Sequence, residues 1–111
     1  MLDIAGGSSN NGANVQQYES NGTDAQKWIL RDAGNGYYYI ISRGAEAYLD
    51  VVSGRSSNGT NVDIYDGNGT AAQKFKFESA PIIDNDEYNI KTALDNNKTL
   101  DVDVEIGRAH V

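Results

Sequence analysis

LDIAGGSSNNGANVQQYESNGTDAQKW, at residues 2–28, returns with changes as LDVVSGRSSNGTNVDIYDGNGTAAQKF at residues 49–75. Each residue of the second stretch follows its counterpart by 47 positions, without a gap. A third copy begins at Leu100-Asp101-Val102. Self-similarity at a fixed period of this length predicts a fold built from equivalent supersecondary units, none of which can bury its apolar face alone.

Length and composition limit what the chain can be. Its 111 residues suffice for one modest core. We therefore expect a single domain, 1–111, with repeats at about 1–36 and 37–86 and a partial third repeat at 87–111. The net charge of −7 offers no basic surface to a phosphate backbone, which argues against nucleic acid as a partner. Cysteine is absent, which excludes disulfides and thiolate metal sites. We expect no cofactor and no membrane span.

Short apolar or aromatic runs between turns predict an all-β chain, since no segment has a convincing helical period. The predicted strands lie at 2–5, 15–18 and 27–31 in the first repeat, at 37–42, 48–52, 62–65 and 74–78 in the second, and at 87–92 and 100–104 in the third. If a complete repeat has four strands, the chain supplies three, then four, then two.

Asn-Gly pairs between these strands supply residues that tolerate positive φ, as tight hairpin turns require. Three pairs continue to threonine, at Asn21, Asn58 and Asn68, and so also match the glycosylation sequon. Because they occur at turn positions between strands, we interpret them as turns.

The repeated motifs resemble those of ricin-B-type lectins. The order Leu-Asp-(Ile/Val), a Gly/Ser/Asn loop, Asn-Val-x-x-Tyr, Asn-Gly-Thr and Gln-x-(Trp/Phe) is similar to the Gln-x-Trp repeat of that family, over almost the whole chain. The resemblance implies a β-trefoil, a six-stranded barrel capped by three hairpins with pseudo-threefold symmetry. The trefoil is expected to be incomplete, because the first repeat lacks its opening strand and the third is truncated. Open strand edges favour self-association, or closure of the barrel by neighbouring repeats.

The aromatic residues of the two Gln-x-(Trp/Phe) motifs, Trp28 and Phe75, are expected in a core shared by the repeats. Aliphatic residues at equivalent positions of the repeats are expected in the same core: Ile4, Val51 and Val102; Val15 and Val62; Ile40 and Ile90.

Polar residues of the first two repeats form a set that can recognise a sugar. A carboxylate or amide pairs with adjacent hydroxyls, and an aromatic ring meets the apolar face of a pyranose. The resemblance implies that the aspartates anchor hydroxyls, that the tyrosines stack on the ring, and that the glutamines orient the aspartates or touch the ligand. The expected site residues are Asp3, Gln16, Tyr18 and Gln26 in the first repeat and Asp50, Asp63, Tyr65 and Gln73 in the second.

Three functions remain open on the sequence. The favoured one is a non-catalytic carbohydrate-binding module for galactose- or xylose-type glycans, extracellular or at the cell surface, within a larger secreted bacterial protein. The alternative is a structural or protein-interaction trefoil, because Ala25 and Ala72 stand where many binding repeats of the family carry an asparagine that contacts the sugar. An enzyme is the least favoured hypothesis, since no nucleophile–base pair is evident.

Three other patterns carry weaker signals. Asp101, Asp103 and Glu105 would share one face of a strand, which is typical of a solvated or protected edge rather than of a cation site. The run Asp84-Asn85-Asp86-Glu87 begins like a calcium loop but lacks the required glycine and distal glutamate, so we expect a connecting loop. His110 lies beside the C-terminus without an evident partner.

Overall fold

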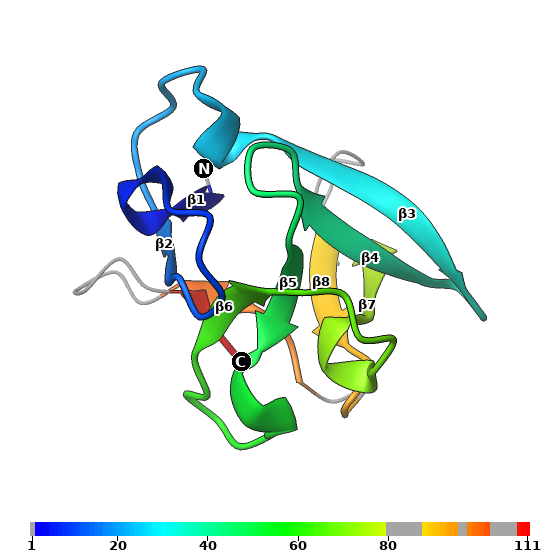
Figure 1. Cartoon of the computed structure of the whole chain (residues 1–111). Helices are drawn as coiled ribbons and strands as arrows, with labels where there is room; N and C mark the ends of the chain where they lie inside the picture. Colours follow the sequence, from blue (N-terminus) through cyan, green and yellow to red (C-terminus); the bar gives the residue numbers. More distant parts are fainter. Residues whose placement is uncertain (1, 80–87, 96–97, 103–108) are drawn as a thin grey trace.

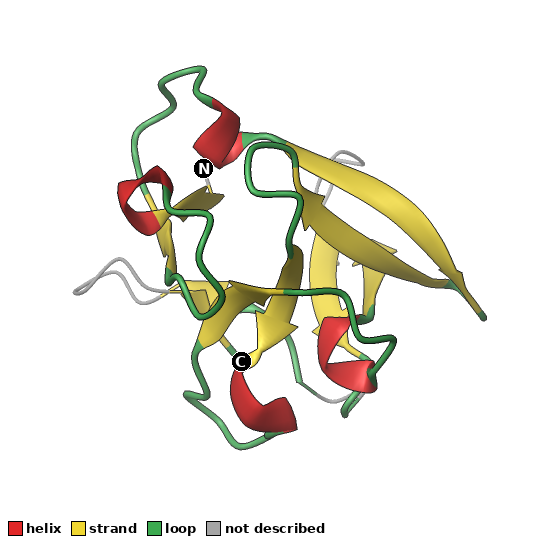
Figure 2. Cartoon of the chain, in the orientation of Figure 1, coloured by secondary structure: helices red, strands yellow, loops and turns green. Residues whose placement is uncertain are grey.

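The computed structural model describes residues 2–79, 88–95, 98–102 and 109–111, which form short strands joined by turns and single-turn 3-10 segments (Figures 1 and 2). The strands are β1 (Leu2–Ile4), β2 (Val15–Gln17), β3 (Trp28–Gly34), β4 (Tyr37–Ser42), β5 (Tyr48–Val51), β6 (Val62–Tyr65), β7 (Phe75–Ser79), β8 (Tyr88–Thr92), β9 (Asp101–Val102) and β10 (Ala109–His110). The 3-10 segments are η1 (Ala5–Gly7), η2 (Asp24–Gln26), η3 (Val52–Gly54) and η4 (Ala71–Gln73). Within the described residues, no helix has the length and apolar character needed to cross a membrane.

All nine predicted strands are present, and a tenth was missed. The expectation that the third repeat supplies only two strands is wrong, because Ala109–His110 pairs antiparallel with Asp101–Val102. A strand of two residues is too short to leave a periodic pattern in the sequence. The described part of the chain thus has three, four and three strands in its successive repeats.

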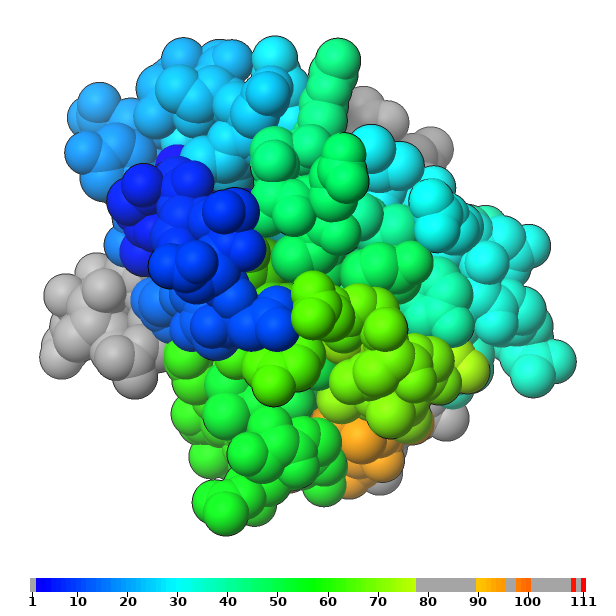
Figure 3. All heavy atoms as spheres, in the orientation of Figure 1, coloured from blue at the N-terminus to red at the C-terminus, as the bar shows by residue number. Residues whose placement is uncertain are grey.

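Contacts between repeats recur with the same spacing as the sequence. Gly12 N donates to Ile64 O at 2.8 Å, and Ile64 N donates to Ala13 O at 3.1 Å. Gly59 N and Val111 N make the corresponding bonds one repeat later, at 2.7 Å to Val111 O and 2.9 Å to Thr60 O. Val111 therefore takes the place of Ile64, and β10 is the third repeat's counterpart of β6. Figure 3 shows the first repeat (blue) lying directly against the second (green).

Two long hairpins connect successive repeats. In the first, β3 and β4 pair through Ile29↔Ile41 and turn at Asn35-Gly36, where both residues have positive φ. In the second, β7 pairs with β8 in the same way. The sheet order is β6-β5-β4-β7-β8, and β3 also pairs with β4. Both hairpins therefore belong to the same sheet as β5 and β6. The β3–β4 hairpin is the long arm at the right of Figure 1.

The core contains most of the predicted residues. Phe75 is fully buried, and the buried aliphatic side chains are Ile4, Val15, Ile40, Ile41, Leu49, Val51, Val62, Ile64 and Val111. Trp28 packs against this core as predicted but is only partly buried, and its Nε1 donates to Leu2 O at 3.2 Å. Ile90 is also only partly buried, and the side chain of Val102 lies outside the described part.

The turn interpretation of the Asn-Gly pairs is confirmed. Their glycines have φ values between 69° and 85°. At Asn21 and Asn68 the side-chain Oδ1 accepts hydrogen bonds from the backbone N and the hydroxyl of the threonine two residues later. These asparagines therefore close the turns that lead into η2 and η4.

Candidate functional site

The carboxylate of Asp3 is buried in the first repeat and held by two amides. β1 and β2 place Asp3 opposite Gln16 in register. Gln16 Nε2 donates to Asp3 Oδ1 at 3.4 Å, and Gln26 Nε2 donates to Asp3 Oδ2 at 2.9 Å. Each oxygen has a further lone pair. The carboxylate is thus fixed in orientation and still able to accept hydrogen bonds.

Gln26 and Gln73 close equivalent loops in the two repeats. Gln26 accepts a bond from Asn21 N at 2.9 Å and donates to Glu19 O at 2.6 Å. Gln73 repeats both contacts, accepting from Asn68 N at 3.0 Å and donating to Asp66 O at 2.9 Å. Both glutamines are buried and line neither pocket described below. Their geometry is that of residues that position an aspartate and a loop.

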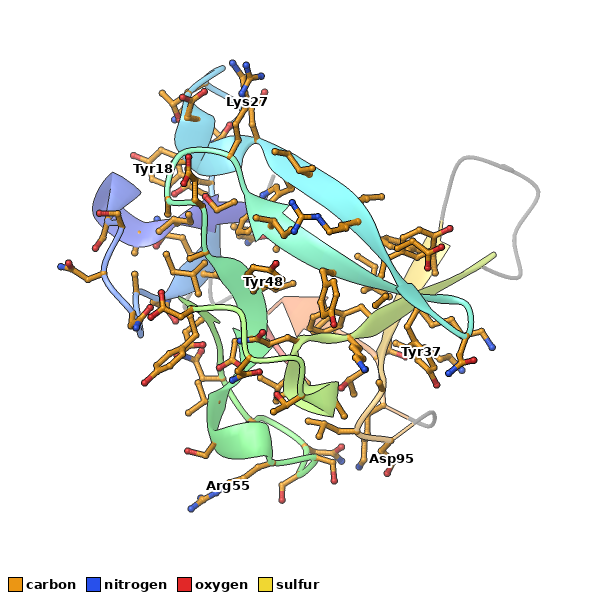
Figure 4. All side chains as sticks on the ribbon, turned by 45° about the vertical axis from the view of Figure 1, so that its right-hand side comes forward. Tyr18, Lys27, Tyr37, Tyr48, Arg55 and Asp95 are labelled. Carbon is orange, nitrogen blue, oxygen red and sulfur yellow. The ribbon has the colours of Figure 1, made fainter. Side chains whose placement is uncertain are left out.

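A pocket of about 420 Å³ opens over Asp3. Tyr18, directly after β2, borders the pocket with 57% of its surface exposed. The lining residues are Asp3, Gly6, Gly7, Gln16, Tyr18, Asn21, Thr23 and Ala25. A carboxylate, an amide and an aromatic ring thus border one hollow, which is the combination that binds a sugar ring. In Figure 4, Tyr18 lies at the upper left of the view, and Arg55 and Asp95 lie at its bottom.

The second repeat has a smaller pocket, of about 290 Å³, with a different wall. It is lined by Asp50, Ser53, Gly54, Asn68, Thr70, Ala71, Ala72 and Leu94. Tyr65 is 44% exposed but is not one of these lining residues, and Asp63 is buried and does not line the pocket either. The structure therefore brings the predicted Asp50, Asp63 and Gln73 together and leaves Tyr65 to one side.

Leu94 was not predicted as a site residue. Its counterpart in the first repeat is Gly44, because Arg43 N and Ala93 N bond to the equivalent Lys27 O and Lys74 O. A Cβ on Gly44 would lie 3.1 Å from Cβ of Asp24, whose own counterpart is Ala71. The first repeat thus combines aspartate with glycine, and the second combines alanine with leucine. In the sequence, Leu94 lies 21 positions after Gln73, within the third repeat.

A pair of carboxyl groups distinguishes the second site. Asp50 on β5 lies opposite Asp63 on β6, and their exposures are only 8% and 7%. Burial raises the pKa of Asp63 to about 7, and the neighbouring Asp50 adds to the shift. Burial also raises the pKa of Asp50, although hydrogen bonds with Asp63 and Gln73 oppose this. A hydrogen bond between two carboxyl groups requires a proton on one of them.

The third repeat carries a histidine in the corresponding place. β9 and β10 put His110 opposite Asp101, as β1 and β2 put Gln16 opposite Asp3. Asp101 is therefore the cross-strand neighbour of His110, for which the sequence offered no evident partner. The side chains of both residues, and the predicted patterns at 84–87 and 103–105, lie outside the described part of the chain. Within that part, no cluster of three histidine, cysteine or acidic side chains could hold a metal ion.

Comparison with known proteins gives consistent matches. Residues 1–65 match the family described as "Ricin-type beta-trefoil lectin domain-like". The designed threefold-symmetric protein ThreeFoil is 31% identical, with a TM-score of 0.88 over 98% of this chain and 78% of its own. An exo-β-1,3-galactanase from Clostridium thermocellum is also 31% identical, with a TM-score of 0.86 over 97% of this chain but only 23% of its own.

A lectin from Polyporus squamosus shares the fold at 19% identity, with a TM-score of 0.80 over 98% of this chain and 37% of its own. No curated protein is similar enough to the chain to count as a match. The motif order, the repeated inter-strand contacts and the match over more than half of the chain agree with one another. The chain belongs to the ricin-type β-trefoil lectin-like domain family.

Proposed function

We propose that the chain is a non-catalytic carbohydrate-binding module that recognises galactose- or xylose-type glycans. The observation that carries this proposal is the first pocket, where Asp3 is held by two amides beside the exposed ring of Tyr18. An oriented acceptor and an apolar ring face, side by side in a shallow hollow, fit adjacent sugar hydroxyls and the C–H face of the same ring.

The galactanase match supports the choice of first ligand. At 31% identity it aligns with 23% of a chain whose name gives β-1,3-galactan as substrate. We therefore place galactose polymers before xylans in order of testing. The same match, over 23% of a longer chain, supports a larger protein as the context in which this module acts. We propose that this protein is bacterial and is secreted or displayed at the cell surface.

The two sites are proposed to differ in strength. The second pocket is smaller, its wall includes Leu94, and Tyr65 does not line it. We expect the first site to dominate binding of a single sugar, with the second adding affinity for polymers by avidity.

A catalytic role for the carboxyl pair is disfavoured by its geometry. The carboxyl groups of Asp50 and Asp63 face each other on β5 and β6, close enough for each to shift the pKa of the other. The paired carboxyl groups of most glycoside hydrolases stand roughly 5–9.5 Å apart, with the sugar between them. A pair this close leaves no space for a glycosidic bond.

The test is binding to β-1,3-galactan and to xylan by affinity electrophoresis, followed by titration calorimetry with oligosaccharides. Asp3→Asn and Asp50→Asn remove one site anchor each and keep the side-chain shape. Asp24→Asn is the matched control, because it removes an exposed charge outside both pockets. We expect weaker binding with Asp3→Asn, none with the double variant and no change with Asp24→Asn.

The alternative is a trefoil that serves as scaffold or binds protein. Ala25 and Ala72 line the two pockets and supply methyl groups where an amide could have met a hydroxyl. A missing neutral hydrogen bond removes about 0.5–1.5 kcal/mol, which matters in a shallow site. A folded chain that binds no glycan, with Ala25→Asn equally inactive, would support this alternative.

We also propose that a second copy, or neighbouring repeats, completes the barrel. Supporting this, Ile29 and Leu30 on β3 are both strongly exposed, and β3 pairs only with β4 among the described strands. Sedimentation of a folded but strictly monomeric chain would contradict the proposed self-association.

A further inference from the structure

We propose that Asp63 is a positioning residue that makes glycan binding by the second site depend on a proton shared with Asp50. This inference rests on the proposed function, because it concerns the anchor of the second sugar site. It assigns to the second site a pH dependence that the first site lacks.

The two repeats place different side chains opposite the aspartate that is proposed to anchor the sugar. In the first, Gln16 stands opposite Asp3 and donates an amide N–H to its carboxylate. In the second, Asp63 stands at the equivalent place opposite Asp50. A carboxyl group can replace the amide as donor only while it carries a proton. Only protonated Asp63 can therefore donate a hydrogen bond to Asp50, as Gln16 donates one to Asp3.

The surroundings of Asp63 favour that protonated form. Asp50 reaches it from β5 and is the charged group that acts on it. Asn14, directly before β2, lies opposite the backbone of Asp63, and Gln73 of η4 bonds to Asp50. Among the described atoms, Asp63 Oδ1 is buried without a hydrogen-bond partner. Both amides are neutral, so neither compensates a second negative charge.

The charge of the pair therefore decides how Asp50 is held. With one proton, Asp63 donates to Asp50, and the pair carries a single negative charge, like Asp3 with Gln16. Without it, two buried carboxylates face each other and repel. Burial and Asp50 raise the pKa of Asp63 to about 7, so this change falls near neutral pH. Asp50 is best oriented for a sugar below that pH.

The experiment measures each site alone. Asp3→Asn leaves the second site, and Asp50→Asn leaves the first. Calorimetry with a β-1,3-galacto-oligosaccharide or a xylo-oligosaccharide, whichever the intact chain binds, is done from pH 5.5 to 8.5. One linked proton titrating near pH 7 predicts that the affinity of Asp3→Asn falls about tenfold between pH 6 and pH 8. The affinity of Asp50→Asn is expected to change less than about twofold.

The decisive variant is Asp3→Asn/Asp63→Gln, which gives the second site the amide of the first. Whatever its absolute affinity, it is expected to bind equally at pH 6 and pH 8. A merely structural role for Asp63 would change affinity without changing its pH dependence. The inference would be overturned if this double variant kept the pH dependence of Asp3→Asn, or if Asp3→Asn itself showed none.

A second readout needs no glycan. The carboxyl carbon of Asp63, followed by NMR in the otherwise intact chain, is expected to titrate near pH 7. A flat trace there contradicts the shared proton while leaving the proposed function untouched. Titration of Asp63 in a chain that binds no glycan at any pH would instead contradict the proposed function, and with it the linkage to binding.

Discussion

Asn61 Nδ2 donates a hydrogen bond to Asn14 Oδ1 at 2.9 Å, joining two residues that hold the same position in successive repeats. The other inter-repeat bonds described above are between backbone groups, whereas this one depends on the identity of two side chains. Both residues are half-buried, and among the described atoms Asn61 Oδ1 is buried without a partner. The pair is therefore a sensitive point of the contact between the repeats.

Removing either asparagine should weaken that contact. We expect Asn14→Ala and Asn61→Ala each to lower the free energy of unfolding by about 1–2 kcal/mol, because each leaves a poorly solvated amide unpaired. The double variant should lose less than the sum of the two, measured by urea denaturation. Strict additivity would show that the side chains do not interact in solution.

The two aromatic residues of the Gln-x-(Trp/Phe) motifs should not be equally important to stability. Phe75 is fully buried, so Phe75→Ala should cost about 3–5 kcal/mol. Trp28 is only partly buried, so Trp28→Ala should cost less. Thermal or urea unfolding of both variants decides the order. An equal or larger loss at Trp28 would mean that its ring is more deeply packed in solution than the structure places it.

The hydrogen bonds by which Gln26 holds Asp3 and the loop at Glu19 can be removed by changing one atom of its side chain. In Gln26→Glu, a carboxylate replaces the amide that donates to Asp3 Oδ2 and Glu19 O. We expect a loss of roughly 1–3 kcal/mol in unfolding free energy, because a buried donor is removed and two carboxylates are brought together. Gln17→Glu, on the exposed end of β2, is the control for the added charge. Similar losses in both variants would argue against a stabilising role of these hydrogen bonds.

The shared proton also predicts how stability depends on pH. The folded chain holds the proton of Asp63 up to about pH 7, whereas the unfolded chain releases it near the ordinary value of 3.8. Between these values the folded state binds more protons, so its stability falls as pH rises, by at most about 1.4 kcal/mol per pH unit.

The comparison that isolates this effect is wild type against Asp63→Asn, by urea denaturation at intervals from pH 4 to 8. The free energy of unfolding of wild type, relative to that of Asp63→Asn, is expected to fall with rising pH and to level off above about pH 7. Parallel curves for the two proteins would show that Asp63 does not retain its proton on folding.

Much of the fold could be predicted because a repeat in sequence must become a repeat in structure. The position of Asp50 follows from that of Asp3, and the same period placed Val62 and Val15 in the core. The period could not give β10, because only Ala109 and His110 form it and the third repeat is shorter between its strands. It also could not give Leu94, since this residue belongs to the following repeat and reaches the second pocket through the fold.

The residue types of the two sites could be predicted from the sequence, but the difference between the first and the second site could not. The change from Gln16 to Asp63 is visible in the sequence, but its consequence depends on burial. An exposed Asp63 would ionise at its ordinary pKa and would simply repel Asp50 at a distance. Because Asp63 is only 7% exposed and lies opposite a second buried carboxyl group, the same substitution leads to a proton shared by the two side chains.

The two tyrosines should separate binding from stability. Tyr18 borders the first pocket and is largely exposed, so Tyr18→Ala should change the free energy of unfolding by no more than about 0.5 kcal/mol. It should nevertheless weaken glycan binding about tenfold or more, because the ring supplies the apolar face of the site. Tyr65→Ala is the matched variant. Since Tyr65 does not line the second pocket, its loss should affect binding much less. Calorimetry with the same oligosaccharide compares them, and equal losses of affinity would mean that Tyr65 turns toward the sugar when the second site is occupied.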